Sequence, residues 1–338
     1  MVDQLKLGIV GFGWVARDYM VPAIRQSERV VLTAVCSAYA SDMADLPDEV
    51  QQFTNLADML QQAPVDAVYI ATPNHLHCAQ TVACLEAGRH VLCEKPMATT
   101  AEDAEAMVRA AQRSGKIYAT AFDQRFHPAH RVIQQLVQNQ LLGTITQVKI
   151  DYACWLPADW SPDNWRVDRH RAGGGAIIDL APHGLDLLET LLNDRIVELT
   201  LYAQRAVHSY AVDDGGVLLL RFARGTLGSV HVGYNRPEAF PRRRLEIIGT
   251  ERMLVAENTL GQDAGGALRL FRANGEREQR VPFNTKALPF EQQINDFANQ
   301  ILLEKPPPRT PEDDLRLFNL LHHALAKADE QARLHHST

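Results

Sequence analysis

The chain has 338 residues, 46% of them hydrophobic and 22% charged, which is the composition of an ordinary globular protein with room for two domains. A formal net charge of −7 argues against a nucleic-acid partner, because such proteins present a basic face. No apolar run reaches the roughly 18 residues of a membrane span. The N-terminus leads directly into a strand, so we expect no secretory signal and no membrane partner.

The five cysteines form no C-x-x-C pair and lie in apolar stretches. Buried, reduced thiols are typical of this pattern. We therefore expect a cytoplasmic protein.

The first predicted elements are a strand over Leu5 to Val10 and a helix over Trp14 to Gln26, joined by Gly11-Phe-Gly13-Trp-Val-Ala16. Such a glycine turn lets the backbone approach a pyrophosphate, whose charge the first helix amides bind. The pattern alone would also fit a structural turn, but the strand before it and the helix after it favour dinucleotide binding. The residues expected to contact the cofactor here are Gly11, Phe12, Gly13, Trp14 and Val15.

The next strand, Val30 to Cys36, ends at Ser37, where an acidic residue would normally hold the ribose hydroxyls of the cofactor. A neutral hydroxyl does not repel a 2′-phosphate, yet Ala38 and Tyr39 supply no arginine to bind one. The cofactor is therefore NAD or NADP, with a slight lean to NADP. Alternatively, Ser37 only caps the strand.

A third strand, Val65 to Ala71, precedes Thr72-Pro-Asn-His75-Leu-His77 at the carboxyl edge of the predicted sheet, where ligands bind. His75 and His77 are two residues apart and could suggest a metal. We predict no metal site here. The expected cofactor contacts in this turn are Thr72, Pro73, Asn74 and His77.

The strand His90 to Cys93 ends in Glu94-Lys95-Pro96 at the same edge. We expect Glu94 and Lys95 to contact the cofactor. The Lys95 ammonium could also stabilise an alkoxide or shift the pKa of a substrate hydroxyl. The alternative is a solvated surface lysine. With a capped helix over Ala101 to Ser114 and a strand over Ile117 to Phe122, residues 1–122 predict a doubly wound parallel sheet, a Rossmann domain.

Residues 123–338 predict a second α/β domain built on a mostly antiparallel sheet, because glycine turns link neighbouring strands. We expect the C-terminal helix to be able to pack back on the first domain. The predicted strands are Val197 to Val207, Val212 to Ala223, Thr226 to Tyr234, Arg244 to Ile248 and Ala267 to Arg272. The predicted helices are Pro128 to Leu142, Ala181 to Leu192, Phe290 to Leu303 and Glu312 to Arg333.

Asp179 and His183 follow the run Gly173-Gly-Gly175 and lie four residues apart where an apolar helix begins. They therefore share one helix face. A carboxylate that orients an imidazole gives a base able to take a proton near neutral pH, and the glycines would let the backbone pass close to a ligand. The alternative is a helix-start acid and a buried core histidine.

In this order the motifs resemble the glucose–fructose oxidoreductase, inositol dehydrogenase and rhizopine catabolism family (Gfo/Idh/MocA) over nearly the whole chain. The resemblance implies a Rossmann domain followed by an open-faced sheet through which the chains form homodimers or homotetramers. It places the catalytic group on Lys95, Asp179 and His183. The motifs that carry it are Gly11 to Ala16, Ala71 to His75, Glu94-Lys95-Pro96, Gln124-Arg125-Phe126, Trp165-Arg166 and Gly173 to His183.

By this resemblance His183 is the general base for a substrate hydroxyl, Lys95 steadies the developing negative oxygen, and Asp179 holds substrate or imidazole. Hydride leaves carbon for nicotinamide. Trp165-Arg166 resembles the segment near the nicotinamide, and Arg125 is also placed at the cofactor. A loop anchored by tryptophan and a structural salt bridge are the respective alternatives.

The predicted function is that of an NAD(P)-dependent dehydrogenase acting on a secondary alcohol or ketone of a sugar, inositol or related polyol. A polar and aromatic loop suits such a ligand. A non-catalytic sensor is one alternative, which the presence of all three catalytic residues argues against. A transient-redox enzyme for glycoside cleavage or aldose–aldose exchange is another. The loop comprises Asp151, Trp155, Asp159, Trp160, Asp163, Asp168, Arg169, His170 and Arg171.

Overall fold

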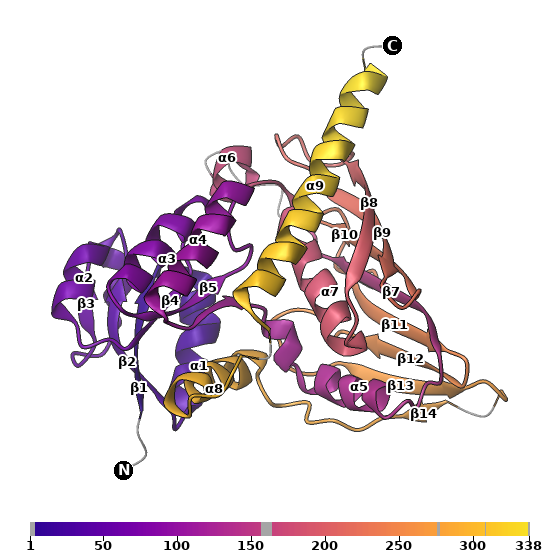
Figure 1. Cartoon of the computed structure of the whole chain (residues 1–338), viewed down its shortest axis with the longest axis horizontal. Coiled ribbons are helices and arrows are strands. Elements are labelled where there is room, and N and C mark those ends of the chain that lie inside the picture. The colour runs from indigo at the N-terminus through magenta and orange to yellow at the C-terminus, as the bar shows by residue number, and fades with distance from the viewer. Residues whose placement is uncertain (1–3, 157–163, 276–277, 308, 337–338) are drawn as a thin grey trace. The chain divides into compact units, whose positions relative to one another are not determined.

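The computed structural model describes residues 4–156, 164–275, 278–307 and 309–336 (Figure 1). The chain divides into two compact units. The first consists of Met1–Phe122 and Phe290–Arg316, and the second of Asp123–Pro289 and Leu317–Thr338. None of the helices in the described ranges is long and apolar enough to cross a membrane.

The first unit contains a six-stranded, fully parallel sheet in the order β3-β2-β1-β4-β5-β6, which confirms the predicted Rossmann arrangement. Its central strands β1 and β4 are buried on both faces except at the exposed Lys6 of β1, which explains their largely apolar sequences. Strand β3, a polar strand of three residues, is absent from the predicted elements. The strands are β1 (Leu5–Val10), β2 (Val30–Cys36), β3 (Gln51–Phe53), β4 (Ala67–Ile70), β5 (His90–Glu94) and β6 (Tyr118–Ala121).

Helices cover both faces of this sheet, with α3 and α4 on one side and α1 and α8 on the other (Figure 1). The expected capping of α4 is confirmed, because the Thr100 hydroxyl accepts the Asp103 amide at 3.2 Å and Gly115 ends the helix at φ +64°. The helical segments are η1 (Ala16–Met20), α1 (Val21–Gln26), α2 (Leu56–Gln62), α3 (His77–Glu86), α4 (Ala101–Ser114) and α8 (Pro289–Leu302).

The sequence predicts residues 290–316 in the second domain, but the structure groups them with the first unit. The reason is hydrophobic burial. Phe290, Ile294 and Phe297 of α8 lie in the same apolar core as Met20 and Ile24 of the first helical segments. The chain therefore returns to the Rossmann sheet before its last helix, α9 (Pro311–His336), begins.

The second unit contains an eight-stranded sheet in the order β14-β13-β12-β11-β7-β10-β9-β8. All neighbours are antiparallel except β7 and β10, so the expected mostly antiparallel sheet is confirmed. Strands β7, β12 and β14 were missing from the predicted strands. The strands are β7 (Ile145–Ala153), β8 (Ile196–Gln204), β9 (Gly215–Phe222), β10 (Leu227–Gly233), β11 (Arg243–Gly249), β12 (Arg252–Glu257), β13 (Ala267–Arg272) and β14 (Gln279–Arg280).

One face of this sheet packs on α5 (Pro128–Gln138), α7 (Ala176–Leu192) and the later part of α9 (Figure 1). Side chains alternate along β9, so that Leu218 and Leu220 are buried against these helices while Val217 and Leu219 point to the opposite face. Leu219 is 51% exposed. The expected open face is therefore present in the second unit.

Two buried histidines at the start of α5 predict an acid-sensitive second unit. His130 approaches the Gln124 carbonyl oxygen at 2.7 Å and the Thr259 hydroxyl at 3.0 Å, and the His127 Nδ1 accepts the Ala129 amide. Burial lowers the pKa of His127 to about 4 and that of His130 to about 3. Both rings are therefore neutral in the folded chain, whereas an unfolded histidine has a pKa of about 6.5.

Below about pH 6.5 the unfolded chain binds more protons than the folded chain, so the free energy of unfolding falls as the pH is lowered. Each ring contributes a loss of up to about 2 kcal/mol between about pH 7 and about pH 5. Denaturant unfolding at both pH values measures it. His130→Gln should lose less stability over this interval than the unsubstituted chain, and an equal loss in both would contradict the assignment.

Candidate active site

The glycine turn after β1 is shaped for a close ligand. Gly11 has φ +86°, and a Cβ there would lie 2.7 Å from the Ala71 carbonyl and from the Thr72 side chain. Its amide donates to the Cys36 carbonyl oxygen at 2.9 Å, which holds the turn beside the end of β2. Gly13 is exposed, and a Cβ there would meet no atom within 4 Å.

Helical backbone begins at Trp14, as predicted, and continues through η1 and α1. The N-terminus of a helix favours an anion, because its first amides point away from the helix. Trp14 is 40% exposed and Val15 is half-buried, whereas the Phe12 side chain is buried in the core of the first unit. The turn and the helix start thus fit the pyrophosphate of a dinucleotide.

The turns after β4 and β5 lie at one edge of the sheet, because these parallel strands are neighbours. His77 joins them. Its Nδ1 lies 2.9 Å from the Pro96 carbonyl oxygen and its Nε2 lies 2.9 Å from that of Thr72. The ring is fully buried, and burial lowers its pKa to about 4. His77, expected among the cofactor contacts, is thus placed to support the segment that carries Lys95.

The other predicted residues of this edge are also held by protein contacts. The Thr72 hydroxyl donates to the Gln80 side chain at 2.6 Å, Pro73 is half-buried, and Asn74 is buried. Tyr69, buried in β4, donates to one Glu94 carboxylate oxygen at 2.6 Å, and the Lys95 amide donates to the other at 3.3 Å. These contacts fix the backbone from which the half-buried Lys95 side chain projects.

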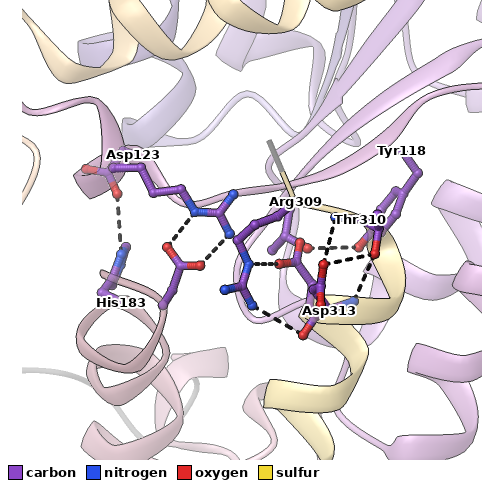
Figure 2. A network of polar contacts seen from close by, with 10 residues as sticks. Tyr118, Asp123, His183, Arg309, Thr310 and Asp313 are labelled. Carbon is purple, nitrogen blue, oxygen red and sulfur yellow. Dashed lines mark hydrogen bonds and ion pairs between the residues drawn. The ribbon is translucent and has the colours of Figure 1, made fainter. Parts of the chain in front are cut away.

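Asp179 and His183 lie one turn apart on α7, which begins at Ala176 rather than at the predicted Ala181. His183 is buried, with its Nδ1 3.4 Å from a carboxylate oxygen of Asp123 (Figure 2). Asp179 accepts a hydrogen bond from the Tyr234 hydroxyl at 2.7 Å. Burial, followed by the neighbouring Asp179 carboxylate, raises the pKa of Tyr234 well above 10, so the phenol remains a donor.

Asp123 and Tyr234 are absent from the predicted site residues. Asp123 lies two residues after the end of β6, so the rule that ligand residues gather at the carboxyl ends of parallel strands could have identified it. Tyr234 follows β10 and offers no such signal, because its role depends on the packing of that strand against α7.

The glycine run before α7 contacts the protein itself. A Cβ on Gly175 would lie 2.0 Å from the Asp213 carbonyl oxygen. The Asp213 carboxylate accepts the amides of Gly175 and Ile177, each at 2.8 Å, and so caps α7. At Gly175 the backbone thus passes close to Asp213, and not to a ligand as expected.

Arg125 forms a buried ion pair with Asp186 of α7. Its Nε donates at 2.6 Å and its Nη2 contacts the second carboxylate oxygen, a two-point geometry that fixes the guanidinium. Of the two readings open for Arg125, the structure shows the salt bridge. The cofactor contact stays a prediction.

Trp165 and Arg166 lie in a short helical turn, η5 (Trp165–Val167), with the guanidinium 4.4 Å from the centre of the indole ring. Asp168, from the polar loop, caps α6 (Arg169–Ala172) by accepting the amides of His170 and Arg171. Three further members of that loop lie outside the described residues: Asp159, Trp160 and Asp163.

Two family models match the chain. Residues 5–122 match the oxidoreductase family with an NAD-binding Rossmann fold, and residues 130–255 match the GFO/IDH/MocA C-terminal domain. The chain belongs to the Gfo/Idh/MocA family. The predicted resemblance is thereby confirmed, and so is the expected enzyme class, an NAD(P)-dependent oxidoreductase acting on CH–OH groups.

Relatives cover most of the chain. It is 31% identical to 1,5-anhydro-D-fructose reductase of Ensifer adhaerens over 91% of each protein. It is 27% identical to levoglucosan dehydrogenase of Pseudarthrobacter phenanthrenivorans over 75% of this chain and 74% of that one. In fold it matches aldose-aldose oxidoreductase from Caulobacter crescentus, with a TM-score of 0.86, 24% identity and coverage of 97% of this chain and 98% of that one.

Proposed function

We propose that this member of the family transfers a hydride between NAD or NADP and a secondary alcohol or ketone of a sugar, inositol or related polyol. The observation that carries the proposal is the contact of His183 with Asp123. His183 lies one helical turn from Asp179 on α7. Relatives named for anhydrofructose, levoglucosan and myo-inositol support this substrate class.

His183 acts as the general base. An Nδ1–H directed at the Asp123 carboxylate, 3.4 Å away, would hold the imidazole in the tautomer that leaves Nε2 as the proton acceptor. The ring takes the hydroxyl proton as the carbon-bound hydrogen departs, and returns it when the reaction runs towards the alcohol. Asp123 is thus a positioning residue.

Lys95 and Asp179 bind the oxygens of the substrate. The Lys95 ammonium stabilises negative charge on the oxygen of the reacting carbon, where a fixed cation lowers the barrier most. Asp179, oriented by the Tyr234 hydroxyl, accepts a hydrogen bond from a second hydroxyl. A bound nicotinamide supplies the hydride chemistry itself. Gly11, Gly13 and the start of the helix at Trp14 would hold its pyrophosphate.

An absorbance screen tests the proposal. The purified chain is mixed with NAD or NADP and a panel of sugars, anhydrosugars and inositols, and the reduced-nicotinamide band is followed. We expect growth of the band with at least one polyol, and growth slower by at least about a hundredfold with His183→Asn. Product formation without any net reduced cofactor would support the transient-redox alternative, and no turnover in either direction with any member would contradict the proposal.

We further propose that two or four copies associate through the open face of the large sheet. The face combines apolar and charged side chains, a mixture that suits a self-complementary contact. Light scattering in solution tests this: a multiple of the monomer mass supports it and the monomer mass contradicts it. Exposed members of the face are Tyr202, Val217, Leu219 and Leu227, beside the ion pairs Lys149–Asp151 and Arg244–Glu246.

We propose a cytoplasmic setting, where thiols stay reduced. Burial raises the pKa of the Cys36 thiol to about 11 and that of Cys84 to about 12. Both thiols are therefore protonated and unreactive near neutral pH.

A further inference from the structure

The end of β2 presents a carboxylate that the sequence pattern does not reveal. Ser37 is buried, and its hydroxyl donates to a carboxylate oxygen of Asp42 at 2.7 Å. The Ser37 amide is also engaged, donating to the Phe53 carbonyl oxygen at 3.0 Å. Asp42 is half-buried on the turn η2 (Ala40–Met43), where its amide donates to the Tyr39 carbonyl oxygen at 3.1 Å.

This carboxylate belongs to the same edge of the sheet as the glycine turn. The Gly11 amide bonds to Cys36, the residue directly before Ser37, so the pyrophosphate turn and the end of β2 are adjacent. In dinucleotide-binding folds the adenosine ribose lies at this place, and an acidic residue at the end of the second strand binds its hydroxyls. Here the strand is followed by Ser37, and the turn η2 places the carboxylate of Asp42, five residues later, beside the Ser37 hydroxyl.

The charged residues of this segment are all negative. Residues 37–50 contain no Lys, Arg or His. A 2′-phosphate placed against this segment would meet carboxylates and no cation from it, whereas the neutral 2′-hydroxyl of NAD could donate to a carboxylate. The acids of the segment are Asp42, Asp45, Asp48 and Glu49.

We propose that Asp42 binds the adenosine ribose hydroxyls and makes the chain select NAD over NADP, with Ser37 positioning its carboxylate. This inference rests on the proposed use of a nicotinamide dinucleotide. It reverses the slight lean to NADP that Ser37 suggests alone, because the Ser37 hydroxyl is already engaged by the Asp42 carboxylate. Asp42 is thus a specificity residue and not part of the reacting group.

Direct binding to the full chain tests the proposal without any substrate. Dissociation constants for NADH and NADPH are measured by titration of protein fluorescence, and those for 5′-ADP and 2′,5′-ADP by calorimetry. We expect NADH to bind at least about tenfold more tightly than NADPH. Asp42→Asn keeps the side-chain shape but removes the charge, and should bring this ratio to within about twofold of one.

Asp45→Asn is the matched control, because Asp45 is an exposed acid of the same segment. It should leave the ratio within about twofold of the unsubstituted chain, while Ser37→Ala should lower it in the same direction as Asp42→Asn. Tighter binding of NADPH than of NADH by the unsubstituted chain would overturn the role of Asp42 but not the proposed function. An unchanged ratio of the two dissociation constants in folded Asp42→Asn would do the same. If neither NADH nor NADPH binds, the proposed function fails as well.

Discussion

Lys95→Met is expected to lower kcat by about 10²- to 10⁴-fold while the dissociation constant for the reduced cofactor changes by less than about fivefold. Methionine keeps much of the length of the side chain but removes the ammonium that stabilises the substrate oxygen. The backbone of the segment, held by Glu94 and by His77, should remain in place. Steady-state kinetics and a cofactor titration on the same preparation give both quantities.

Lys116→Met is the matched control. Lys116 is also half-buried in the first unit but lies just before β6, at the amino end of a strand, whereas Lys95 follows the carboxyl end of β5. The kcat of Lys116→Met should be close to that of the unsubstituted chain. Unchanged turnover in Lys95→Met would remove this residue from the chemistry, and loss of cofactor binding alone would make it a binding residue.

His183→Asn should lower kcat by about 10²- to 10⁴-fold, because asparagine cannot take the hydroxyl proton. Asp123→Asn should lower kcat in the same direction by a smaller factor, since the imidazole remains but loses the acceptor of its Nδ1 proton. KM should change little in Asp123→Asn if the carboxylate only positions the ring. Kinetics with the best substrate of the screen give both parameters.

The second unit offers a comparable pair for control. His231 lies 3.5 Å from a carboxylate oxygen of Asp151, but on the open face of the sheet and with 40% of its side chain exposed. His231→Asn should leave kcat unchanged. Similar losses in His231→Asn and His183→Asn would mean that both act through folding, which thermal unfolding of each variant would reveal.

Local patterns were sufficient for most of the fold. Strand β4 is a continuous apolar run and β1 is interrupted only by Lys6, so both strands are visible in the sequence. The turn between β1 and the first helix is also visible, because the backbone at Gly11 favours glycine. Strand β3 is short and polar and depends on its neighbour for its conformation. The placement of α8 could not be predicted either, because an amphipathic helix does not specify which apolar core it joins.

The candidate site divides in the same way. The identity of His183 and Asp179 followed from their spacing on one helix, but their partners did not. Asp123 lies 60 residues before His183 in the chain, and Tyr234 lies 55 residues after Asp179. Each reaches its partner only through tertiary packing. Asp42 is only five residues from Ser37, but the sequence does not show that the turn between them brings its carboxylate to the Ser37 hydroxyl.

Transfer of a carbon-bound deuterium tests the central claim most directly. The best polyol of the screen is labelled at the carbon that is oxidised, and the reduced cofactor is isolated after turnover and analysed by mass spectrometry and NMR. Direct hydride transfer predicts that the label appears at nicotinamide C4. Loss of the label to solvent, with unlabelled reduced cofactor, would contradict the account.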